Sequence, residues 1–251
     1  MTLDPIHQFN IDNIFTIGHI GRYTIAFTNS TAYMLLAVAL ICLLTIRGLK
    51  GRQLVPGRLQ AMAELSYVFV ASMIRSTAGE EGMRFFALVY SIFMFILVVN
   101  VVSIIPYTFS VTSHIIVTAA FALLVFFTVI VYGFYKNGLR FFKIFVPSGI
   151  PIYLLPLVVT IEFISFLSRP LSHSVRLFAN MLAGHITLKV FAGFVALLGT
   201  SLGAIGWIGG VVPLAMTVAL TALELLVAFL QAYVFAILTC IYLNDALHPG
   251  H

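Results

Sequence analysis

A single arginine, Arg176, stands in a stretch without other charged side chains, between Leu171 and His185. This segment is apolar enough to lie inside a lipid bilayer, where an isolated cation costs about 3 kcal/mol or more. A chain that keeps such a charge usually needs it for the passage of an ion or a substrate. Because arginine does not release its proton in proteins, Arg176 can act only as a fixed positive charge.

His185 and Glu224 form a candidate pair for proton transfer. If the last two apolar segments form a helical hairpin, Glu224 can face either His185 or Arg176. A carboxyl group and an imidazole can both titrate near neutral pH when they are desolvated. The pair therefore indicates a proton relay, and the alternative is a satisfied buried pair without a role in transport. Gln231 lies seven residues after Glu224 and shares its helix face.

Glu162, Arg169 and Arg176 recur every seven residues, which places them on neighbouring faces of a helix. Asn180 follows Arg176 by four residues, on nearly the same face. Small residues lie close by: Ala179, Ala183 and Gly184. Small side chains let another helix approach closely, so Arg176 projects from a surface suited to a partner helix. Glu162 and Arg169 could instead form a structural ion pair or lie at a water-filled rim.

Composition places the chain in a membrane. Of its 251 residues, 61% are hydrophobic and 8% are charged, whereas soluble domains carry about 25% charged residues. The net charge of +5 is spread over short loops, which does not suggest a nucleic-acid partner. Cys42 and Cys240 each lie within an apolar run and indicate neither a disulfide nor a metal site. We therefore expect an integral membrane protein without a metal or another cofactor.

Several apolar runs predict membrane-spanning helices, at about residues 32–46, 85–105 and 115–135. Residues 58–76 read as an amphipathic helix on the membrane surface, and residues 1–29 read as a loop-like external arm. Loops rich in lysine and arginine usually lie on the cytoplasmic side of a membrane. Here the basic loop residues are Arg47, Lys50, Arg52, Arg58, Lys136, Arg140 and Lys143. The N-terminus is therefore expected outside.

The mostly apolar segment 150–199 is too long for a simple span, since a continuous helix of that length would measure about 75 Å. A hydrocarbon core is about 30 Å thick, so the helix must break or tilt strongly. Pro151, Pro156 and Pro170 could bend it. A glycine-rich turn at 199–210 and a second long apolar run at 212–243 follow.

Together these patterns predict an all-α integral membrane protein with several transmembrane helices, one membrane-surface amphipathic helix and a C-terminal hairpin of two long, strongly tilted helices. Residues 1–251 are expected to form one membrane domain. Its parts are an external arm (1–29), peripheral spans with the surface helix (30–148) and the helical hairpin (149–251).

Two long motifs carry a resemblance to a known family. One is RLFANMLAGH, from Arg176 to His185, and the other is ELLVAFLQAYVFAILT, from Glu224 to Thr239. Both resemble subunit a of F-type ATP synthases, and the resemblance covers nearly the whole chain, including the predicted surface helix and the segment from Asn100 to Pro106.

The resemblance implies a role for each candidate residue. Arg176 looks like the invariant arginine that faces the rotating c-ring and its proton-carrying carboxylate. Asn180 and Gln231 look like polar neighbours of the arginine at that interface. His185 and Glu224 resemble the imidazole and acid that line the aqueous half-channel from the outer side.

Three further residues are carried over from the family pattern. Glu162 resembles a carboxylate of the opposite half-channel. Asn100 and Ser103 occupy positions near the outer half-channel, although the sequence alone would make them ordinary helix-packing residues. Ser103 stands where some members of the family have an acid.

The implied function is proton translocation within an ATP synthase, in which two half-channels and a fixed arginine couple proton flow to rotation of the c-ring. Such a subunit is not an enzyme by itself and binds no nucleotide. Its expected partners are the c-ring, b-type peripheral stalk subunits, the lipid bilayer and protons. The expected location is an energy-transducing membrane, with the bacterial inner membrane favoured over the mitochondrial one.

Two other functions would use some of the same residues. A secondary transporter or ion channel could bind an anionic substrate at Arg176, but it would predict repeated halves, and the sequence shows no internal repeat. An intramembrane hydrolase could use Ser201, which lies in a G-x-S-x-G match from Gly199 to Gly203. That match falls in a turn between helices rather than after a strand, so packing of small residues explains it better.

Overall fold

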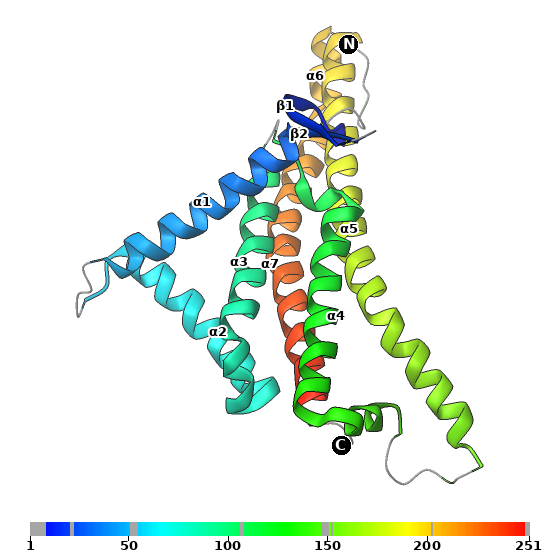
Figure 1. Cartoon of the computed structure of the whole chain (residues 1–251). Coiled ribbons are helices and arrows are strands. Elements are labelled where there is room, and N and C mark those ends of the chain that lie inside the picture. Colours follow the sequence, from blue (N-terminus) through cyan, green and yellow to red (C-terminus); the bar gives the residue numbers. More distant parts are fainter. Residues whose placement is uncertain are drawn as a thin grey trace. The chain divides into compact units, whose positions relative to one another are not determined.

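The computed structural model describes residues 9–20, 23–50, 55–105, 108–146, 151, 153–201 and 203–248. The elements follow one another along the chain as coloured in Figure 1: β1 Asn13–Ile20, β2 Tyr23–Thr28, α1 Asn29–Leu49, α2 Arg58–Gly82, η2 Met83–Phe85, α3 Phe86–Ser103, η3 Val111–Ser113, α4 Ile115–Asn137, η4 Gly138–Phe145, α5 Leu155–Ser201, α6 Gly203–Gly209 and α7 Val211–Leu247. The helices predicted for the three spans are confirmed as α1, α3 and α4, and those of the two long segments as α5 and α7.

Within the described residues, five helical segments are long and apolar enough to cross a membrane: Asn29–Leu49, Arg58–Ser103, Ile115–Phe145, Leu155–Ser201 and Val211–Leu247. Hydroxyl side chains inside these segments bond back to a carbonyl of their own helix. Examples are Thr128 Oγ1, which donates to the Leu124 oxygen at 2.7 Å, and Thr221 Oγ1, which donates to the Thr217 oxygen at 2.8 Å. Lipid offers no other partner to such groups.

The described residues group into two compact units. The first unit contains residues 9–40, 96–114 and 177–231. It begins with an antiparallel hairpin of β1 and β2, drawn in blue in Figure 1. The prediction of a loop-like arm is wrong for these residues. They are rich in β-branched and aromatic side chains, which favour strands, and Phe15 stacks on Phe27 across the hairpin at 5.1 Å.

The second unit contains residues 41–95, 115–176 and 232–248. Here α4 runs beside the red C-terminal end of α7 (Figure 1), and Asn137 Nδ2 donates to the backbone oxygen of Ala246 at 2.7 Å. Lys136 forms an ion pair with Glu81 and so joins α4 to α2. The basic loop residue Arg52 and the predicted helix end at Pro106 lie outside the described residues.

The predicted surface helix is α2, which extends beyond residue 76 and changes direction at Gly79, where φ is +68°. Val70 and Ile74 are buried, whereas Met62, Leu65 and Val68 are exposed large apolar side chains. An apolar face without a covering helix is compatible with lipid contact. The location of α2 at a membrane surface stays a prediction.

α5 does not break, because its 47 residues form one helix with Pro170 inside it. Proline removes one backbone donor and crowds the carbonyl four residues earlier, and the helix continues through this defect. Its length is about 70 Å at 1.5 Å per residue, so a strong tilt remains the way to fit it to a bilayer. The glycine-rich turn contains Gly203, which has a φ of +57° and is the first residue of α6.

Candidate functional site

In the first unit, α7 places Glu224 directly against Gly184 of α5. A Cβ atom added at Gly184 would lie 3.2 Å from Glu224 Cδ and 3.3 Å from Cγ, and it would overlap Oε1. Glu224 is 7% exposed, and its two carboxyl oxygens have no hydrogen-bond partner among the described residues. A buried polar group without a partner is costly. The Glu224 carboxyl therefore needs either a proton or a water molecule.

His185, the residue that follows Gly184, is also buried, at 7% exposure. Its Nε2 atom lies 3.2 Å from the Oγ of Ser103, near the end of α3. Ser103 in turn donates to the backbone oxygen of Asn100 at 2.7 Å. The ring of Phe9 lies 6.4 Å from the His185 ring, centre to centre, in an edge-on arrangement. α3, α5 and α7 thus bring Ser103, His185 and Glu224 together in one unit.

Further buried polar side chains come from the segment just before α4. Thr112 Oγ1 donates to Asn100 Oδ1 at 2.8 Å, and Ser113 donates to Ser110 at 2.6 Å. The Nδ2 atom of Asn100 has no hydrogen-bond partner among the described residues. Sequence reasoning did not single out these hydroxyl residues. Their clustering after an apolar span, over residues 108–114, is the signal that could have found them.

Arg176 and Asn180, four residues apart on α5, are both exposed. None of the ion pairs formed by the described residues involves Arg176. His185, nine residues beyond Arg176, is buried, as expected for the opposite helix face. Arg176 therefore presents a permanent charge outward, whereas His185 lies inside the first unit.

Two candidates lie differently from Arg176 and Asn180. Gln231 is buried at 8% exposure on α7, in a row with Ala228 and Ala232, which are both 0% exposed. Glu162 is half-buried on the first part of α5. The alternative of an ion pair between Glu162 and Arg169 is not what the structure shows, because Arg169 pairs with a residue of α7.

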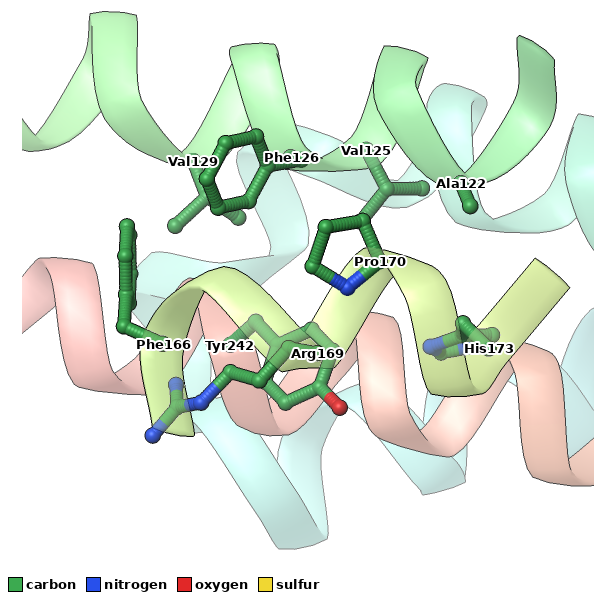
Figure 2. Close-up of a pocket in the computed structure, with 9 residues that line it drawn as sticks. All are labelled: Ala122, Val125, Phe126, Val129, Phe166, Arg169, Pro170, His173 and Tyr242. Carbon is green, nitrogen blue, oxygen red and sulfur yellow. The ribbon is translucent and has the colours of Figure 1, made fainter. Parts of the chain in front are cut away.

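That residue is Asp245, whose Oδ2 lies 2.7 Å from Arg169 Nη1 in the second unit. The Arg169 guanidinium also lies 4.9 Å from the centre of the Tyr242 ring. Both line a small pocket between α4, α5 and α7, in which His173 lies one helical turn beyond Arg169 (Figure 2). His173 is 5% exposed, and its ring lies edge-on to that of Phe235, with the two ring centres 4.1 Å apart.

The chemistry open to these groups is proton transfer. The Glu224 carboxyl and the His185 imidazole are both buried in the first unit, Glu224 against Gly184 and His185 against Ser103. No group of three or more potential metal ligands occurs among the residues that the structure describes. Ser201, the residue of the hydrolase alternative, is exposed and donates to the Leu197 carbonyl at 2.7 Å within its own helix. The Ser201 hydrogen is thus given to its own helix, whereas a hydrolase nucleophile would give it to a histidine.

Comparisons with known proteins show the family of the chain. The family described as ATP synthase A chain matches residues 31–244. ATP synthase subunit a of Bradyrhizobium diazoefficiens is 73% identical over 251 residues, which is all of both chains. The Nitrobacter winogradskyi subunit is 74% identical over 249 residues, 99% of this chain and 100% of the relative. A Rhodopseudomonas palustris subunit is 72% identical over the full length of both.

A match over most of the chain, relatives that are bacterial, and five apolar segments able to cross a membrane lead to one conclusion. The chain belongs to the ATP synthase A chain family, as the multi-pass, proton-translocating and non-catalytic membrane subunit a of an F-type ATP synthase.

Proposed function

We propose that His185 and Glu224 carry protons along an outer half-channel, with Arg176 as the fixed charge that faces the carboxylate of a c-ring. The observation that carries this proposal is the buried Glu224 carboxyl, which lies against Gly184, the residue before His185 in the sequence. This carboxyl has no hydrogen-bond partner among the described residues. Water that supplies the missing partners would also supply a route for protons.

Asn100 and Ser103 would line the same half-channel, since both are buried and Ser103 contacts His185. Asn180 and Gln231 would be the polar neighbours of the interface, and Glu162 would belong to the inner half-channel. Asn180 is exposed on α5 and Glu162 is half-buried, so a partner or water can reach both side chains. Gln231, which is buried, would need the ring to approach closely.

Arg176 would act through its permanent charge. A guanidinium favours the deprotonated state of an approaching carboxylate and cannot itself pass a proton on. A proton that leaves the ring would therefore enter a half-channel instead of crossing directly beneath Arg176. In this arrangement residues 149–251 form the ring-facing hairpin of one membrane domain, residues 30–148 form its periphery, and b-type stalk subunits are the further partners.

The test is ATP-driven proton pumping in inverted membrane vesicles that carry Arg176→Lys. We expect pumping to be lost although the complex assembles, because lysine is a compact charge that can release its proton. The matched control is Arg140→Lys, at an exposed residue of η4, which should pump normally. Normal pumping by Arg176→Lys would show that Arg176 has a structural role and would refute its place in the proposal.

Glu224→Gln tests the other half of the proposal in the same vesicles. The amide keeps the size of the side chain but cannot exchange a proton, so proton pumping should fall while the amount of assembled complex stays the same. A variant that fails only in assembly would show that the Glu224 carboxyl is structural.

A further inference from the structure

We propose that Ser103 fixes the tautomer of His185, so that His185 accepts and releases its proton only through Nδ1. Ser103 would be a positioning residue, because it acts through His185 and not on the proton itself. The inference rests on the proposed role of His185 in proton transfer.

The Ser103 hydroxyl has one hydrogen and two neighbours. One neighbour is the backbone oxygen of Asn100 at 2.7 Å, which can only accept a hydrogen bond. The other is His185 Nε2 at 3.2 Å, which can donate or accept, depending on the tautomer. Since the hydroxyl hydrogen goes to Asn100, the Ser103 oxygen is left as an acceptor. His185 Nε2 must then carry the hydrogen of the second bond.

Burial makes this assignment strict. Ser103 is 4% exposed and Asn100 is 0% exposed, so solvent does not readily replace either partner. The other tautomer would place a lone pair of Nε2 opposite a lone pair of Ser103 Oγ and would forfeit a buried hydrogen bond. An unmade bond of that kind shifts an equilibrium about tenfold or more. Neutral His185 therefore keeps its hydrogen on Nε2 and its lone pair on Nδ1.

A one-sided route for the proton follows. An arriving proton binds the lone pair of Nδ1 and gives an imidazolium, which keeps the Nε2–H bond to Ser103. The same Nδ1–H bond then breaks as the proton leaves, and the ring returns to its starting tautomer. Release through Nε2 instead would require the Ser103 oxygen to accept the proton while its hydroxyl hydrogen is committed to Asn100. His185 therefore works without a ring flip.

The direct test is ¹⁵N solid-state NMR on the assembled complex in lipid, with ¹⁵N-labelled histidine and with pH high enough to keep His185 neutral. A His185→Gln sample identifies the signals by subtraction. We expect Nε2 to be protonated in the unaltered complex. In Ser103→Ala, the population with hydrogen on Nδ1 should rise about tenfold relative to the Nε2 form. A hydrogen on Nδ1 in the unaltered complex, or a ratio that Ser103→Ala leaves unchanged, would overturn the inference.

The functional test is proton pumping by the same complexes. Ser103→Ala should lower the pumping rate about twofold, because a tenfold change in a tautomer ratio near 10:1 takes the active form from about 90% to about 50%. Ser103→Thr, which keeps a hydroxyl, should recover most of the loss. The matched control is Thr239→Val, because Thr239 is 0% exposed and its hydroxyl donates to the Phe235 oxygen of its own helix at 2.8 Å. If Ser103→Ala pumps normally while His185→Gln does not, the inference fails and the proposed function stands. If His185→Gln also pumps normally, the role of His185 in the proposed function fails.

Discussion

Replacing Gly184 by alanine adds one methyl group at the point where α5 meets the Glu224 carboxyl. The new Cβ would lie 3.2 Å from Cδ and 3.3 Å from Cγ of Glu224, whereas carbon atoms usually stay 3.5–4.0 Å apart. The carboxyl carbon must then move by roughly 0.3–0.8 Å, and Oε1 by more. The atoms that have to yield belong to the end of a flexible side chain, so the backbone can stay in place.

A displacement approaching 1 Å in a reacting group can lower a rate by about 10²-fold, so we expect Gly184→Ala to reduce proton pumping by roughly 10- to 100-fold. The amount of assembled subunit should not fall, because alanine is favoured over glycine in a helix by about 1 kcal/mol. The assay is ATP-driven acidification of inverted vesicles, compared with the amount of subunit a in the same membranes.

Gly209→Ala is the matched control, since nothing lies within 4 Å of a Cβ added at Gly209. Combining Gly184→Ala with Glu224→Asp should restore part of the pumping, because the shorter side chain leaves room for the methyl group. Normal pumping by Gly184→Ala alone would refute the reasoning, since the place of the carboxyl against α5 would then not matter for proton transfer.

Two predictions concern stability instead of transport. Asp245→Asn removes the charge that pairs with Arg169 at 2.7 Å, and we expect the free energy of unfolding to fall by about 1 kcal/mol. The measurement is the temperature at which the complex aggregates in detergent, which should be lower for the variant. An unchanged aggregation temperature would contradict this prediction. Burial lowers the pKa of His114, in the loop before α4, so its contribution to stability is complete above about pH 6.5 and is lost as the pH falls through the lowered pKa. His114→Gln should weaken this acid destabilisation, and an unchanged pH dependence of thermal aggregation would refute the assignment.

The long helices could be predicted from the sequence because lipid imposes a simple rule, in which an apolar run of sufficient length must satisfy its own backbone. α3 and α4 begin and end within two residues of the predicted spans. The hairpin of β1 and β2 was missed because residues 13–28 mix polar and apolar side chains without a strict alternation. The sequence predicted the length of α5 correctly. It did not predict whether Pro170 would break the helix, since a long helix can continue past one missing hydrogen bond.

Contacts between residues far apart in the sequence were harder to predict than the helices. The spacing of seven residues made Glu162 a possible partner of Arg169, yet Arg169 forms its ion pair with Asp245, which is 76 residues away. His185 and Ser103 are 82 residues apart and meet at 3.2 Å. Helix periodicity gives the face on which a residue lies, but not which residue of another helix comes to that face. The hairpin hypothesis did bring Glu224 to the neighbourhood of His185.

The roles proposed for Arg176, His185 and Glu224 agree with the charge and the burial of each side chain. Arg176 cannot lose its proton, so it does not need shielding from water in order to stay charged, and it lies exposed. In the proposed function His185 and Glu224 change their proton occupancy, and each is 7% exposed, where few groups can exchange protons with them. If the roles were reversed, a buried arginine would need a permanent counter-ion and could not respond to a passing carboxylate. An exposed carboxyl–imidazole pair would equilibrate freely with water and would offer no defined route. The opposite exposures of these residues therefore match the separate tasks that the proposal gives them, a fixed charge and a titrating pair.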